Sequence, residues 1–77
     1  MSKVLRWSIS TIREKIRSII ADSRNIAHLF LGIEIKKLNM KNDTIIIEGT
    51  YRYLLEEGKF HIELDESTLG VKRIEIE

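Results

Sequence analysis

The fold is decided by residues 42–64, "NDTIIIEGTYRYLLEEGKFHIEL", in which apolar and polar side chains alternate with few interruptions. A period of two residues is typical of a β-strand that buries one face. We therefore predict strands over about 44–54 and 59–65, joined as an antiparallel hairpin. The inward face of the first strand carries two aromatic side chains, Tyr51 and Tyr53, which we interpret as core residues.

The apolar pattern also predicts how these two strands pair. If both apolar faces meet the same core, Tyr53 lies opposite Phe60. A two-residue turn at Glu56–Glu57 would need a positive φ angle at both glutamates, which is costly for a residue other than glycine. We therefore expect a four-residue loop over 55–58 that ends in glycine.

The stretch "SISTIREKIRSIIADSRN", residues 8–25, has a helical period instead. Its isoleucines recur at spacings of three and four, which gives one apolar stripe. This pattern predicts a helix over about 9–22. Thr11 and Glu14 have the spacing of a capping box, with Ser8 and Ser10 as competing caps.

The rest of the chain adds two strands. Alternation over about 28–37 predicts a strand, with a bulge or strand end near Lys37 where the phase slips, and "KND" at 41–43 predicts a turn. A short final strand is expected over 71–76. Together these elements predict an α+β fold in one domain, 1–77: an N-terminal amphipathic helix packed on a four-stranded antiparallel β-meander.

Composition limits the cellular setting and the chemistry. The chain has fourteen Ile, no Cys, no Gln and no Pro, and 25 of its 77 residues are charged. Such a charge-rich, amide-poor composition favours a thermophilic, archaeal source. We find no membrane-length apolar run and no signal peptide, so we expect a cytoplasmic protein. Without Cys, and with His28 lacking a partner at ligand spacing, no metal or other cofactor is expected.

Charge is divided between the two halves of the chain. Residues 1–42 carry nine Lys or Arg against three acids, whereas 43–77 carry four against nine. This division indicates either a basic face for an anionic partner or two halves that attract each other. The candidate contacts to an anion or a nucleic acid are Arg13, Arg17, Arg24, Lys36, Lys37 and Arg52.

One polar cluster is a candidate reactive site. In the expected register Arg52 lies opposite His61 and diagonal to Glu63, which could serve phosphate binding or acid–base chemistry. We interpret the cluster as a solvated sheet face, because an open sheet lacks the concavity of a catalytic site. No catalytic motif was found in the sequence, and we expect the protein not to be an enzyme.

Several apolar residues have no place in the expected core. They are Val4, Leu5 and Trp7 before the helix, and Phe30, Ile46 and Leu54 on the outward side of the strands. Either the N-terminal segment or a second chain covers them, and we take Trp7, Phe30, Ile46 and Leu54 as interface candidates. The expected function is a small non-catalytic protein-interaction module, a homodimeric accessory or adaptor subunit. The alternative is a small nucleic-acid-binding protein that uses the basic half.

The segment "YRYLLEEGKFHIELDESTLGVKRIEI", residues 51–76, resembles the closing hairpin of small helix-then-meander families such as PepSY domains and gas vesicle protein O. The shared elements are an aromatic strand, a glycine turn, a strand that ends in Leu64–Asp65, and a restart at Gly70–Val71. The resemblance implies this arrangement of strands and no particular function.

Overall fold

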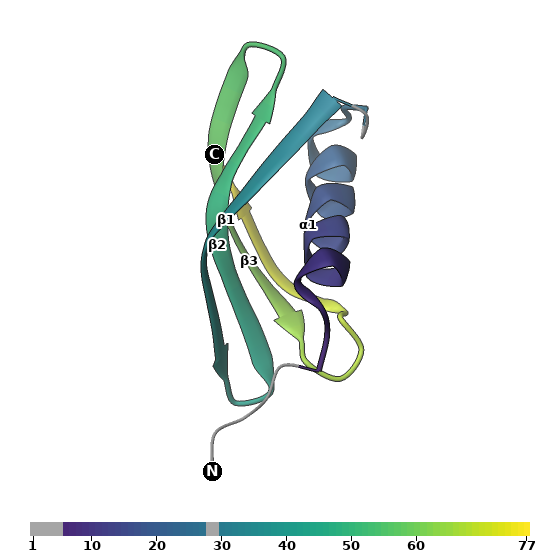
Figure 1. Cartoon of the computed structure of the whole chain (residues 1–77), viewed down its shortest axis with the longest axis vertical. Helices are drawn as coiled ribbons and strands as arrows, with labels where there is room; N and C mark the ends of the chain where they lie inside the picture. Colours follow the sequence, from purple (N-terminus) through teal and green to yellow (C-terminus); the bar gives the residue numbers. More distant parts are fainter. Residues whose placement is uncertain (1–5, 28–29) are drawn as a thin grey trace.

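The computed structural model describes residues 6–27 and 30–77, and it confirms the α+β fold (Figure 1). The elements are α1 (Ile9–Arg24), β1 (Leu31–Lys41), β2 (Thr44–Tyr53), β3 (Glu56–Asp65) and β4 (Val71–Ile76). The strands form one antiparallel meander in the order β1-β2-β3-β4. In the described part of the chain, no helix is long and apolar enough to cross a membrane. Our predictions for Val4, Leu5, His28 and Leu29 fall outside the described residues.

Helix α1 starts at one of the expected caps and ends later than predicted. The Ser8 hydroxyl accepts a hydrogen bond from the Thr11 amide at 3.1 Å, so Ser8 is the N-cap and the Thr11–Glu14 capping box is not formed. The helix continues two residues beyond the predicted end at Asp22. It stops at Asn25, which adopts a left-handed conformation and donates its N–H to the Ala21 carbonyl.

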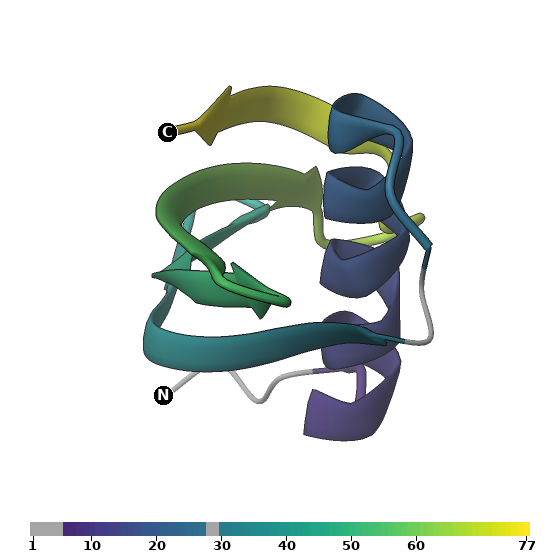
Figure 2. The same ribbon diagram turned by 90° about the horizontal axis from the view of Figure 1, so that it is seen from above.

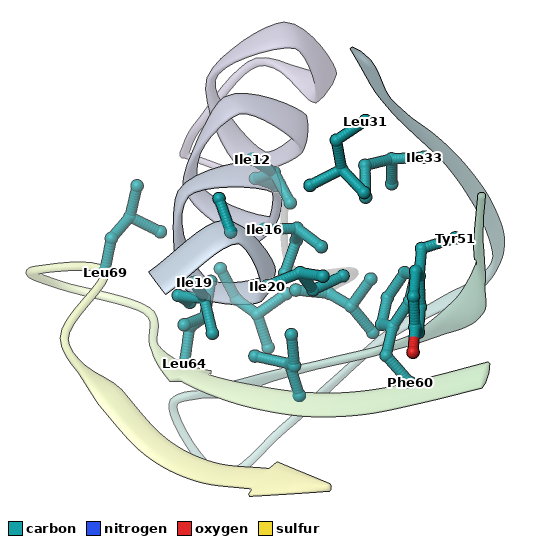
Figure 3. Close-up of a cluster of buried hydrophobic side chains, with 14 residues drawn as sticks. Ile12, Ile16, Ile19, Ile20, Leu31, Ile33, Tyr51, Phe60, Leu64 and Leu69 are labelled. Atoms are coloured by element: carbon teal, nitrogen blue, oxygen red, sulfur yellow. The ribbon is translucent and has the colours of Figure 1, made fainter. Parts of the chain in front are cut away.

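The core lies between α1 and the inner face of the sheet, as the isoleucine stripe and the strand alternation predicted. Figure 3 shows the helix isoleucines directed toward the strands that carry Leu31, Tyr51, Phe60 and Leu64. Tyr51 is buried, and its hydroxyl donates to the Glu77 carbonyl oxygen at 2.8 Å. The fully buried large side chains are Ile12, Ile16, Ile20, Ile45, Ile47, Ile62 and Leu64.

The β1–β2 hairpin turns where it was expected. Asn42 and Asp43 have φ angles of 50° and 61°, and a type I′ turn requires positive φ at both central residues. Asn and Asp tolerate positive φ angles. The predicted bulge is present, because the register shifts between Ile35 and Lys37 and leaves Lys36 as the extra residue. The strand does not end there, and it continues to Lys41.

The predicted register of the β2–β3 hairpin is wrong by four residues. Tyr53 pairs with Glu56 instead of Phe60, and the turn consists of Leu54 and Leu55 alone. A shift by an even number leaves every side chain on its predicted face. Pairing of large with small residues explains the difference, because each buried aromatic lies opposite a glycine: Phe60 opposite Gly49, and Tyr51 opposite Gly58. A Cβ atom on Gly58 would lie 2.5 Å from Cε1 of Tyr51.

Candidate functional site

The outer face of the sheet, away from α1, carries a histidine held between two carboxylates. His61 on β3 lies opposite Glu48 on β2, and its Nδ1 is 2.8 Å from Glu48 Oε2. Its Nε2 is 2.7 Å from Oε2 of Glu63, which is two residues along the same strand. We call Glu48, His61 and Glu63 the histidine cluster. A groove lined from all four strands passes over it, with Lys37 and Glu75 among the lining residues.

The cluster favours the charged form of the imidazole. Hydrogen bonds to Glu63 and then to Glu48 raise the pKa of His61 above its ordinary value of 6.5. The same contact with His61 lowers the pKa of the Glu48 carboxyl. With both ring nitrogens bonded to carboxylates, the imidazolium has no free nitrogen to accept a proton from a substrate. The geometry thus suits a fixed charge on a sheet surface better than a general base.

The histidine cluster should give folding stability a defined pH dependence. Because the folded-state pKa of His61 is raised, its contribution is complete below about pH 6.5 and is lost as pH rises through the folded-state pKa. The Glu48 contribution has the opposite sign and is lost as pH falls below its ordinary pKa of 4.5.

We therefore expect the stability difference between the wild type and His61→Asn to shrink as pH rises from about 6.5 through the folded-state pKa of His61. Urea unfolding at a series of pH values measures this difference. Subtracting the variant removes the contributions of the titrating groups that both proteins share. A difference that stays constant over this range would contradict the assigned contacts.

Arg52 does not join the histidine cluster, contrary to our prediction. Because of the register shift it lies opposite Glu57, with Nε 3.2 Å from Glu57 Oε1. Of the predicted group of Arg52, His61 and Glu63, the structure brings together only the last two. Glu48 was missed because its pairing with His61 depends on the register, and the alternation of the strand does not contain that information.

The six candidate anion contacts fall on two sides of the molecule. Arg13, Arg17 and Arg24 lie on α1, whereas Lys36, Lys37 and Arg52 lie on the sheet. Five of the six are already engaged, and one of these is Lys37, which lies opposite Glu48 and lowers the pKa of its carboxyl. Arg17 pairs with Glu14 at 2.8 Å, Arg24 lies 5.8 Å from the centre of the Tyr51 ring, Lys36 pairs with Glu34, and Arg52 pairs with Glu57. The structure does not bring these residues together as one basic surface.

The four interface candidates do not form one surface. Trp7 is partly buried against the core, and its indole N–H donates to the Glu66 carbonyl at 2.6 Å. Ile46 is half-buried in the middle of the outer face, between Asn39 and Glu63.

Phe30 precedes β1 and Leu54 follows β2, next to the pair Leu31–Tyr53 that ends the β1–β2 ladder. With Leu55 they form an exposed apolar group, which we call the apolar tip. Phe30 is 59% exposed, Leu54 64% and Leu55 98%. Leu54 and Leu55 of the tip form the turn of the β2–β3 hairpin, which projects past the end of α1 (green in Figure 1). Leu55 was missed because we placed it at the start of a longer loop, although two adjacent leucines in a turn were a visible signal.

The residues described also limit what could be bound. In this part of the chain, no group of three or more His, Asp or Glu side chains is arranged to hold a metal ion.

Comparison with protein-family models, curated proteins and solved structures returned no match. The resemblance of residues 51–76 to PepSY domains and gas vesicle protein O therefore rests on the pattern of those residues alone.

Proposed function

We propose that the protein is a small non-catalytic interaction module, a homodimeric accessory or adaptor subunit that binds another protein through its apolar tip. The observation that carries this proposal is the composition of the β2–β3 turn. A two-residue turn normally uses Gly, Asn or Asp, and the β1–β2 turn of this chain does so with Asn42–Asp43. The second turn uses two leucines and exposes both.

The leucine turn is unfavourable for the isolated protein. Leu54 has a φ angle of 56°, a conformation that costs roughly 1–2 kcal/mol for a residue with a Cβ atom. Exposed apolar side chains gathered at one end of a molecule are typical of a contact surface. Binding in an apolar pocket would remove both leucines from water and give the turn a use that the fold alone does not.

Charges beside the tip favour a protein as the occupant. Glu56 and Glu57 follow the leucines directly, and the nearby cation Arg52 is paired with Glu57. An anionic membrane surface or a nucleic-acid backbone would be repelled by these carboxylates. We therefore propose a partner protein with an apolar pocket and a basic rim.

Replacing Leu54 by glycine is expected to raise the free energy of unfolding by about 1 kcal/mol, because glycine adopts a positive φ without strain. In a domain of this size, the midpoint of thermal unfolding should rise by roughly 4–8 °C. The matched control is Leu55→Gly, which also removes an exposed leucine but lies at a residue without positive φ. An equal gain in both variants would show that strain at Leu54 is not the cause.

Binding through the tip is tested by a capture experiment on an extract of the source cells. We expect the wild type and His61→Asn to retain the same protein, and the double variant Leu54→Asn, Leu55→Ser to lose it. Asparagine fits the turn, so the variant keeps the fold. Equal capture by the tip variant, or no protein retained by the wild type, would overturn the role of the tip.

The alternative is a nucleic-acid-binding protein that uses the basic face of α1, on which Arg13 is exposed. A salt titration with generic DNA and RNA distinguishes the two functions. Binding that weakens steeply with salt would support the alternative, and no binding at low salt would exclude it.

We also propose a cytoplasmic location and a thermophilic, archaeal source. The support for the source is the charge-rich composition and the ion pairs on the sheet surface, Glu34–Lys36, Arg52–Glu57 and Arg73–Glu75. The support for the location is the lack of a membrane-length apolar run in the sequence.

A further inference from the structure

Strand β4 forms an edge of the sheet, and among the described residues it pairs with β3 on one side only (yellow in Figure 2). One hydrogen bond shows which residues of β4 direct their backbone groups toward β3: the Glu77 amide donates to the Lys59 carbonyl at 2.9 Å. In an antiparallel ladder, residues bonded to the neighbouring strand alternate with residues that point the other way. Arg73 and Glu75 therefore bond toward β3, and Ile74 and Ile76 direct their N–H and C=O groups to the open edge.

The apolar side chains of β4 are unusually exposed, and its charged side chains include both signs. Ile74 lies opposite Ile62 on the core face of the sheet, yet it is 41% exposed, and Val71 is 45% exposed. On the other face, Arg73 and Glu75 are more than half exposed and pair with each other along the strand. The edge thus combines outward-directed backbone groups, an apolar side and one charge of each sign.

We propose that β4 pairs antiparallel with β4 of a second copy, around a twofold axis at Ile74. In this register the outward-directed backbone groups of Ile74 bond to those of its counterpart. Arg73 of each copy then faces Glu75 of the other, which gives two cross-strand ion pairs. The exposed isoleucines meet on the core side, and the two sheets join into one of eight strands.

Neighbouring registers fail on charge. The backbone phase allows only shifts that keep Ile74 and Ile76 bonded across the edge. Centring the axis on Glu75 would place that carboxylate opposite its own copy, and centring it on Arg73 would do the same with two guanidinium groups. Centring it on Ile76 would place Glu75 opposite Glu77. The register centred on Glu75 would also place Arg73 opposite Glu77, so the register centred on Ile74 is the only one of the four that pairs opposite charges without pairing like charges.

The other edge of the sheet, β1, is less suited to pairing. Its bulge at Lys36 interrupts the strand near its middle, and lysines lie at positions 36, 37 and 41. Bulges and lysines on an edge strand oppose pairing with another chain. Where β4 pairs with β3, the register shifts between the pairs Glu63–Arg73 and Leu64–Val71, at the start of β4. The pairing of Arg73–Ile76 is regular.

The test is a charge exchange across the twofold axis, read by light scattering over a range of concentrations. Arg73→Glu places two carboxylates opposite each other in each cross-strand pair, and Glu75→Arg places two guanidinium groups there. We expect each variant alone to dimerise about tenfold more weakly or worse than the wild type. An equimolar mixture of the two variants should form a heterodimer, because all its cross-strand pairs have opposite charges.

Lys59→Glu is the matched control. It makes the same change in net charge as Arg73→Glu at an exposed position of β3, and we expect it to leave dimerisation unchanged. Circular dichroism verifies that each variant is folded, as expected for exposed side chains.

The inference rests on the homodimer of the proposed function, and the outcomes separate the two. A wild type that is monomeric overturns both the homodimer and this interface. A wild-type dimer that both charge variants leave intact, or a variant mixture that stays monomeric, overturns the interface alone.

Discussion

Replacing Gly49 by alanine is expected to lower the free energy of unfolding by about 3 kcal/mol, because the new methyl group has no space. A Cβ atom at this position would collide with the Glu34 carbonyl oxygen and would lie 2.9 Å from Cζ of Phe60. The first neighbour is backbone and the second is a buried ring, so neither can move cheaply. Urea or thermal unfolding measures the loss.

Gly32→Ala is the matched control for this substitution. Gly32 also lies in a strand, but a Cβ atom there would meet only the Arg52 carbonyl oxygen at 3.8 Å, an ordinary contact distance. We expect a change of less than about 0.5 kcal/mol. Equal losses in the two variants would mean that Phe60 does not pack over Gly49, and the register of β2 and β3 would then need revision.

Ile47→Ala is expected to cost about 2–5 kcal/mol, since Ile47 is fully buried between the sheet and α1. Domains of this size are stabilised by roughly 0.05–0.15 kcal/mol per residue, so the loss would be a large share of the total. The control is Ile46→Ala, one residue earlier on the opposite face, where the side chain is half-buried and a cost of about 1 kcal/mol is expected. A larger loss at Ile46 than at Ile47 would mean that the faces are reversed.

Much of the fold could be predicted from local pattern. The isoleucine spacing located the helix, and the alternation of apolar residues assigned the inward face of β2 and β3 correctly. The turn at Asn42–Asp43 and the bulge at Lys36 were also predicted, because each leaves a direct trace in residue type or in phase. These features depend on neighbours in the sequence.

The pairing register could not be predicted in the same way. Alternation fixes only whether a shift is even or odd, and turn chemistry was the remaining guide. That guide was misleading, because it favoured a loop ending in Gly58 over a turn with a left-handed leucine. The structure instead uses Gly49 and Gly58 as space for the aromatic rings opposite them, a packing effect across strands.

The candidate sites depended on the register, which explains why they were predicted only in part. Moving β3 by four residues separates Arg52 from His61 and brings Glu48 to it. The same shift shortens the loop to Leu54–Leu55 and creates the apolar tip. The outward-directed backbone groups of β4 could not be foreseen either, because the phase of this strand requires a known hydrogen bond.

The mass of the wild-type protein in solution tests the central claim, that this chain acts as a homodimeric interaction module. Light scattering on the purified protein should give about twice the chain mass of 9.0 kDa, falling toward the chain mass on dilution. A mass of 9.0 kDa at every concentration would contradict the account.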